Sequence, residues 1–147
     1  MKESNWEECI ETSSSLKVSP DKSKSNSLID IARGRNRYLR ENAIKESNAN
    51  YVFEGYYSSV LELLHAIVLL KGYKVSNHLC LAYYLRDIMK REDLFRLFDG
   101  CRFKRNSLVY YGRKMDFETA KITIRNAMEL IKELENFLTK EFKIKQT

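Results

Sequence analysis

Residues that break helices are scarce in this sequence after its first twenty positions. The chain has 147 residues, of which one is a proline, Pro20, and five are glycines. Because proline removes a backbone donor and glycine is costly inside a helix, their scarcity allows long uninterrupted helices almost anywhere after residue 20. Hydrophobic residues make up 44% of the chain, which is enough for one domain of this length to bury a core.

Apolar residues recur at helical spacing along most of the chain. The clearest stripe follows Asp116, a residue type that caps helices, and continues to about residue 142. No segment shows the alternation with period two that is typical of a half-buried strand. We therefore expect an all-α fold, an antiparallel four-helix up-and-down bundle with a short additional helix. The helices are predicted over residues 20–46, 50–71, 76–91, 92–111 and 117–142.

Residues 1–18 are polar and rich in serine, and we expect them to form an N-terminal arm ahead of a helical domain over residues 19–147. The arm is predicted to contain a short helical turn around Trp6 and then an extended segment. A lone tryptophan in a polar arm needs an apolar contact, so Trp6 is expected to pack onto the domain. Two roles stay open for the arm, which either covers the core of its own chain or reaches a second copy.

One arginine interrupts an apolar stripe, and two sequence signals mark helix ends. Ser19-Pro20 predicts the start of the first long helix, and Gly72 predicts the end of the second. Arg35 falls inside the apolar stripe of the first helix, where a guanidinium needs a partner, so we expect a buried or interfacial ion pair. The flanking arginines are expected to be solvated or paired along the helix: Arg33, Arg37 and Arg40.

The cysteines and the hydropathy of the chain predict its compartment. Cys9, Cys80 and Cys101 are odd in number and widely spaced, which argues against a zinc site and a disulfide framework and favours a reducing cytosol. The N-terminus is polar and has no apolar signal core. The longest apolar run, residues 63–70, is too short for a bilayer, which needs about 20 residues. We therefore expect a soluble cytoplasmic protein without a membrane partner.

Positive charge is concentrated between Arg96 and Lys114. The whole chain has a net charge of +6 and a pI of about 9.2, and this stretch, with six cations and one acid, has a local net charge of +5. Such an excess favours an acidic partner such as RNA or a nucleotide. Neither a metal nor a cofactor is expected. The residues expected to bind phosphate or nucleic acid are Arg102, Lys104, Arg105, Tyr111 and Arg113.

Arg105, Asn106 and Tyr110 are the candidate catalytic residues in this stretch. A guanidinium can hold a phosphate through two parallel hydrogen bonds, and an amide and a tyrosine hydroxyl can orient the same oxyanion. On a regular helix Arg105 and Tyr110 lie about 140° apart, so we expect them to converge only where the turn loosens or a second chain supplies one of them. The alternative is a helix end with solvated cations and two core tyrosines.

These features resemble the HEPN family of α-helical domains over roughly residues 19–140. The resemblance rests on the Ser19-Pro20 start, the helix from Tyr57 to Gly72 that ends in Lys-Gly-Tyr-Lys, and Arg105-Asn106 followed four to six residues later by an aromatic residue. It implies a homodimer that brings both copies of the motif into one cleft. Active members are metal-independent ribonucleases, many of them toxins paired with a nucleotidyltransferase antitoxin. An arginine and a polar residue hold the phosphate, and a histidine assists attack by the ribose 2′-hydroxyl.

The sequence departs from the family pattern at the histidine. Arg105 and Asn106 match, but Tyr110, or Tyr111 with one more residue of spacing, takes the histidine position, and neither of the two histidines of the chain lies in the motif. Tyrosine has a pKa near 10 and is a poor general base at neutral pH. We therefore expect a HEPN-type module that binds RNA or nucleotide phosphate, weakly catalytic or non-catalytic, with a nucleotidyltransferase partner.

Two further hypotheses stay open. The chain is alternatively a metal-independent endoribonuclease toxin that uses Arg105, Asn106 and Tyr110 and leaves a 2′,3′-cyclic phosphate. In the second alternative it is a purely structural or interaction bundle, in which the tyrosines belong to a dimer interface.

Overall fold

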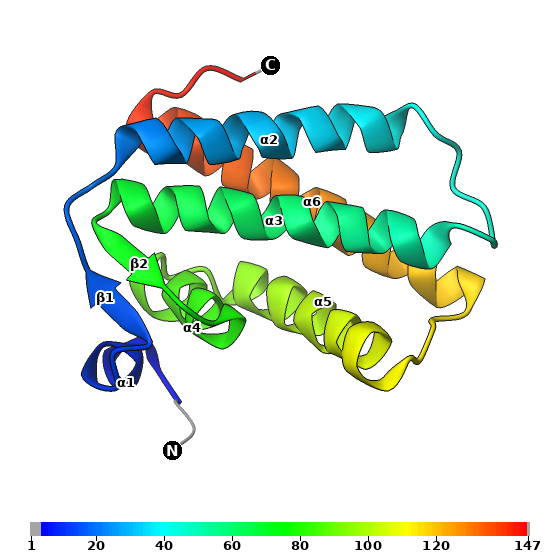
Figure 1. Cartoon of the computed structure of the whole chain (residues 1–147), viewed down its shortest axis with the longest axis horizontal. Coiled ribbons are helices and arrows are strands. Elements are labelled where there is room, and N and C mark those ends of the chain that lie inside the picture. Colours follow the sequence, from blue (N-terminus) through cyan, green and yellow to red (C-terminus); the bar gives the residue numbers. More distant parts are fainter. Residues whose placement is uncertain (1–3, 147) are drawn as a thin grey trace.

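Helices account for most of the structure. The computed structural model describes residues 4–146, of which 73% are helical and 4% lie in strands. The predicted all-α class is therefore confirmed, although residues 1–3 of the predicted arm and residue 147 lie outside the described range. In chain order the elements are α1 (Trp6–Glu11), β1 (Ser15–Lys17), α2 (Lys22–Arg40), α3 (Ala49–Leu70), β2 (Tyr73–Val75), α4 (His78–Tyr83), the π-helix η1 (Tyr84–Ile88), α5 (Glu92–Tyr111) and α6 (Phe117–Phe142) (Figure 1).

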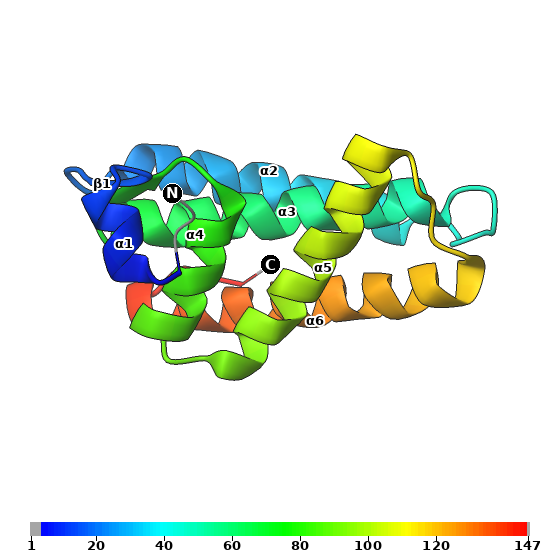
Figure 2. The same cartoon turned by 90° about the horizontal axis from the view of Figure 1, so that it is seen from below.

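The central helix is α3. In Figure 1, α2 and α5 lie on opposite sides of α3, and α6 lies behind it. Figure 2 shows α5 running obliquely across α3 and α6, so a regular up-and-down four-helix bundle is not confirmed. By length and composition α3 could cross a membrane, but 67% of its apolar 18-residue window is buried inside the structure, as in the core helix of a globular domain.

The long helices agree with the sequence prediction better at α3 and α6 than at α2. Asp116 caps α6 as predicted, because its Oδ1 accepts a hydrogen bond from the Thr119 amide at 2.8 Å. The first long helix is capped by Asp21 rather than started by Ser19-Pro20, and it ends at Arg40 instead of residue 46. The following loop is held by Asn48, whose side chain bonds the backbone of residues 43 and 45 and so competes with a longer helix.

Two short strands and a π-helix were not predicted. β1 pairs with β2 in an antiparallel ladder whose register joins Ser15 to Val75 and Lys17 to Tyr73. Each strand has three residues, too few to show an alternating pattern. The single helix predicted over 76–91 is instead divided into α4 and η1, and Asn77 caps α4 by accepting the Cys80 amide hydrogen.

Trp6 packs onto the domain, as the sequence predicts. Its side chain is 5% exposed and meets the rings of Tyr73 and Tyr84 edge-on, at centroid distances of 5.2 and 5.1 Å. Its backbone N–H donates to Asp87 Oδ2 at 2.8 Å. Trp6 and Cys9 both belong to the core cluster, so the described part of the N-terminal arm covers the core of its own chain.

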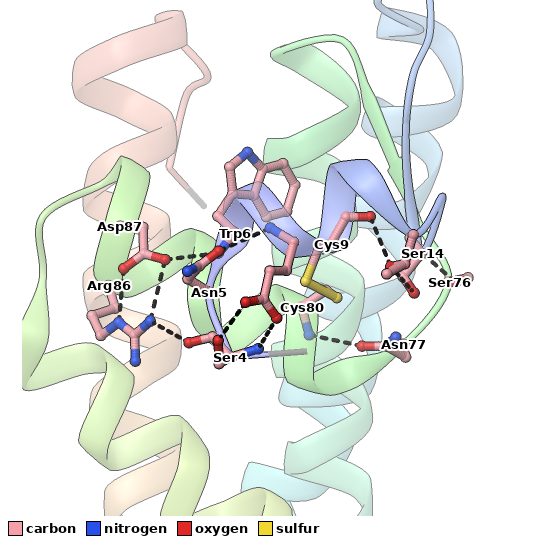
Figure 3. Close-up of a disulfide and its surroundings, with 12 residues drawn as sticks. Ser4, Asn5, Trp6, Cys9, Ser14, Ser76, Asn77, Cys80, Arg86 and Asp87 are labelled. Carbon is pink, nitrogen blue, oxygen red and sulfur yellow. Dashed lines mark hydrogen bonds and ion pairs between the residues drawn. A yellow bond between two sulfur atoms is a disulfide. The ribbon is translucent and has the colours of Figure 1, made fainter. Parts of the chain in front are cut away.

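A disulfide joins this arm to α4, which contradicts the expectation of three reduced cysteines. Cys9 in α1 is bonded to Cys80 in α4, 71 positions away in sequence (Figure 3). Cys101 is a free and buried thiol. Linear spacing misled the prediction because α1 folds back onto α4 and brings the two Cα atoms to 6.0 Å. The cysteines therefore no longer support a reducing compartment.

The predicted ion pair of Arg35 is confirmed. Its guanidinium bonds both carboxylate oxygens of Glu62 in α3, and the two side chains are 30% and 20% exposed. Arg33 does not remain solvated, because it binds Glu135 of α6 at 2.7 Å. These two pairs connect the polar edge of α2 to α3 and α6.

Candidate functional site

The second half of α5 holds most of the predicted site residues on a continuous helix. Glu92 and Asp93 lie in the first turn of α5, where carboxylates favour the helix dipole, and Gly112 ends the helix in the left-handed conformation, with φ of 62°. The helix continues through Gly100 without a break. The motif is thus carried on a regular frame.

Four of the predicted residues meet in one surface pocket. Arg102, Arg105, Asn106 and Tyr110 line a cavity of about 300 Å³, which we call the α4–α5 pocket. Its other wall, at the start of α4, was not predicted: Ser76, Asn77, His78 and Leu79.

The remaining predicted phosphate ligands do not join this pocket. Lys104 and Arg113 line a second cavity of about 230 Å³, together with Asp116 at the start of α6. Tyr111 lines neither cavity and is 73% exposed. The structure therefore separates the predicted phosphate-binding set into two sites. The interpretation of Tyr110 and Tyr111 as core tyrosines is wrong, because Tyr110 is also 67% exposed.

Arg105 and Tyr110 converge within one chain, contrary to the expectation from helical geometry. The Arg105 guanidinium carbon lies 5.8 Å from the centroid of the Tyr110 ring and 5.9 Å from that of Tyr57, while α5 remains α-helical over its whole length. The long arginine side chain spans the angle that separates the two Cα positions. Neither a loosened turn nor a second chain is required.

Arg102 and Arg105 differ in the charges that surround them. Arg102 donates to Asp99 Oδ1 through Nε and Nη2, at 3.0 and 2.9 Å, so a carboxylate holds its guanidinium. Within residues 4–146, Arg105 has no carboxylate partner, and its guanidinium lies near the rings of Tyr57 and Tyr110. Its charge is therefore the one in the α4–α5 pocket that remains available to an anion.

His78 is a candidate site residue that sequence reasoning missed. Its Nδ1 lies 3.1 Å from the hydroxyl oxygen of the buried Tyr57 in α3. Burial, with a further contribution from the charges of Arg105, His65 and Arg102, lowers the pKa of His78 to about 4. Burial also raises the pKa of Tyr57, so at neutral pH the pocket contains a neutral imidazole next to a protonated phenol. The chain positions 78 and 105 carry no local signal of this proximity.

The chemistry of the pocket suits an anion rather than a metal. In the part of the chain that the structure describes, no group of three or more histidine, cysteine or carboxylate residues could hold a metal ion. The α4–α5 pocket presents guanidinium, amide, phenol and imidazole groups, which together can hold a phosphate, exchange a proton and stack on a ring.

Comparison with known proteins does not identify a family for this chain. No protein-family model, no curated protein and no solved structure matches it. The resemblance to HEPN domains therefore stays a prediction based on the residues themselves, and the function is inferred from the geometry of the site.

Proposed function

We propose that this protein is a HEPN-type helical module that binds the phosphate of RNA or of a nucleotide in the α4–α5 pocket, with weak catalysis or none. The observation that supports the proposal best is the environment of Arg105, which lines a pocket with Asn106 and Tyr110 and has no carboxylate partner among the described residues. A cation in that position can form paired hydrogen bonds with a phosphate.

The surrounding residues support the same use. Asp99 neutralises Arg102 and fixes its guanidinium at the edge of the pocket. His78 is neutral at pH 7, so it adds hydrogen-bonding capacity without adding charge. The exposed ring of Tyr110 offers a face on which a base can stack, and such stacking is typical of single-stranded RNA binding.

The binding test compares Arg105→Ala with Arg125→Ala, a control that removes an exposed arginine from α6 far along the chain from the motif. Fluorescence anisotropy with a labelled single-stranded RNA at low salt is the measurement. Loss of a charged hydrogen bond should weaken binding about tenfold or more for Arg105→Ala and also reduce its salt dependence. Equal losses in both variants, or no RNA binding at all, would contradict the proposal.

A second candidate function, a metal-independent endoribonuclease, is favoured by His78. The family pattern places its histidine in the motif, whereas this chain offers a histidine from α4 in the same pocket as Arg105. When Nδ1–H of His78 donates to the Tyr57 oxygen, Nε2 keeps its lone pair for a substrate. It would take the proton of a ribose 2′-hydroxyl as that oxygen attacks phosphorus. The bond from phosphorus to the 5′-oxygen breaks, and the 5′-oxygen takes a proton from Tyr110 or water.

The two functions give different results with RNA in EDTA. An endoribonuclease leaves 2′,3′-cyclic phosphate and 5′-hydroxyl ends, and both Arg105→Ala and His78→Gln should reduce the rate by about a hundredfold or more. A binding module leaves the RNA intact. If neither binding nor cleavage depends on Arg105, while Tyr110→Phe changes assembly, the structural bundle replaces both.

The proposal includes a homodimer and a nucleotidyltransferase partner. Phe103 and Tyr110 are seven residues apart and therefore on one face of α5, where they are 66% and 67% exposed. Exposed aromatic side chains in such an arrangement are typical of interfaces. Light scattering of the purified protein, alone and mixed with a candidate nucleotidyltransferase, measures both assemblies, and a strictly monomeric protein would remove the dimer from the proposal.

A further inference from the structure

Another polar cavity, separate from the two described above, lies between α2 and α6 on the other side of α3 from α5 (Figure 1). It has a volume of about 220 Å³ and shares no lining residue with the α4–α5 pocket. Asn36 and Arg40 of α2, Tyr56 of α3 and Lys132 of α6 contribute polar groups to it, and we call it the α2–α6 pocket. Figure 1 shows α2 and α5 on opposite sides of α3, so the two cavities belong to different parts of the molecule.

The α2–α6 pocket has an excess of positive charge. Arg33 lies in its wall but is held by Glu135, with Nε and Nη2 at 3.0 and 2.7 Å from the carboxylate oxygens. Arg40 and Lys132 have no carboxylate partner within the range that the structure describes, and both are exposed. Three cations and one acid leave a local charge of +2, which matches a dianion.

Two polar groups of this pocket have no hydrogen-bond partner among the described residues, and one of them, Asn36 Oδ1, is buried. Asn36 is 3% exposed, and its Oδ1 is buried without a hydrogen-bond partner. Tyr56 is 4% exposed, and among residues 4–146 its hydroxyl bonds no other group. Burial raises the pKa of Tyr56, and the nearby charge of Arg40 opposes that shift, so the hydroxyl stays protonated beside a cation. The pocket thus offers a buried acceptor that lacks a donor, and a hydroxyl that can donate to an anion.

The size and apolar lining of the pocket limit the ligand further. Met128 and Ile131 of α6 line the pocket together with Tyr56. The volume is below the roughly 300–1,000 Å³ of pockets that enclose drug-sized ligands. The volume suits one ring system, and Arg40 and Lys132, which also line the pocket, are exposed and accessible to a charged group attached to that ring.

We propose that the α2–α6 pocket binds a phosphate monoester joined to a ring that carries an N–H group, which is the chemistry of a nucleoside 5′-monophosphate. The phosphate contacts Arg40, Lys132 and the Tyr56 hydroxyl. The ring lies against Met128 and Ile131, and its N–H group donates to the carboxamide oxygen of Asn36, which can turn about its terminal torsion to meet the donor. The site is independent of the phosphate site in the α4–α5 pocket.

The test is calorimetric titration of the full chain with AMP, adenosine and inorganic phosphate. AMP should bind at least tenfold more tightly than either of its parts. Arg40→Ala should weaken AMP binding at least tenfold, whereas Arg37→Ala, an exposed arginine on the same helix outside the pocket, should leave it unchanged. Arg125→Ala, an exposed arginine of α6 that lines neither pocket, should also leave it unchanged. AMP binding that survives Arg40→Ala but is lost with Arg105→Ala would overturn this proposal and support the α4–α5 pocket instead.

The role of Asn36 has its own control. Asn36→Leu keeps the size of the side chain and removes the unpartnered acceptor, so the variant should fold. Purine riboside 5′-monophosphate, which lacks the exocyclic amine of AMP, should bind the native chain more weakly than AMP does. The Asn36→Leu variant should bind both nucleotides with the same affinity. Equal affinities of the native chain for both nucleotides would overturn the assignment. If a 5′-phosphorylated oligonucleotide binds more tightly than AMP and depends on Arg40, the source of the phosphate is an RNA end. If AMP binds more tightly than the oligonucleotide, the source is a free nucleotide.

Discussion

Reduction of the Cys9–Cys80 disulfide is expected to destabilise the protein by about 4 kcal/mol. The bond closes a loop of 71 residues, and restricting a loop of that length in the unfolded chain corresponds to roughly 15 cal/mol/K of lost entropy, or about 4 kcal/mol at 25 °C. For a chain of this size, that change lowers the melting temperature by roughly 13 °C. The same magnitude should separate the native protein from a variant in which both cysteines are alanine.

The assay combines urea unfolding with counting of thiols. Urea midpoints are compared for the native protein and the double alanine variant, each with and without dithiothreitol, and the reductant should shift only the native protein. Alkylation of the folded, non-reduced protein should label no cysteine, because Cys101 is 1% exposed and burial raises its pKa to about 12. Unfolding without reductant should expose one thiol to the reagent. Unfolding with reductant should expose three.

The reasoning would be refuted by three labelled cysteines in the unfolded, non-reduced protein. A native midpoint that does not change on reduction would refute the entropic argument even if the bond is present. Agreement between the reduced native protein and the double alanine variant is the internal control, since both lack the cross-link.

Two other perturbations have signs that follow from the structure. The pKa of His78 is about 4 in the folded protein and about 6.5 in the unfolded chain, so the unfolded chain binds the proton first and stability should fall as pH decreases from about 6.5 to 4. NMR titration should show the low pKa of His78. Arg105→Ala should raise this pKa without restoring the ordinary value, because burial is the larger cause of the shift. An imidazole that titrates near 6.5 in the native protein would contradict this. Gly72→Ala should lower the free energy of unfolding by about 1–2 kcal/mol, because φ at Gly72 is 87° and the new Cβ would lie 3.0 Å from the carbonyl oxygen of Val18. Gly100→Ala, which places a Cβ in open space within α5, should raise the free energy of unfolding by about 0.5–1 kcal/mol. Urea midpoints that shift in the same direction for both glycines would refute the backbone argument.

The sequence predicts the helices best where the signals are local and agree with one another. α6 combines an Asp116 cap with a long apolar stripe, and α3 combines a stripe with the Gly72 stop, and both lie close to their predicted ranges. The end of α2 was predicted too late, because the side chain of Asn48 bonds the loop backbone in a way that helical periodicity does not reveal. The strands were missed because their pairing, not their three-residue pattern, makes them strands.

In the candidate site, too, the sequence reveals the local features but not the contacts between distant residues. The excess charge and the Arg105-Asn106 motif are visible in the sequence, since they are contiguous. The exclusion of Lys104 and Arg113 from the α4–α5 pocket is not visible in the sequence. Lys104 is adjacent to Arg105, and neighbouring residues on a helix point to different sides, whereas Arg113 lies beyond Gly112, where α5 has ended. The sequence also could not indicate that Asp99 neutralises Arg102 while Arg105 keeps its charge.

The sequence by itself determined the helical class, the end of α3 at Gly72, the Asp116 cap of α6, the ion pair of Arg35 and the location of the positive charge. Each of these depends on residues within a few turns of one another or on a residue type that requires a partner. Only the tertiary structure decided the Cys9–Cys80 bond, the position of His78 beside Tyr57, and the cavity around Asn36. These features join residues of different helices, and their distances depend on how the helices cross, which no periodicity along one chain segment specifies.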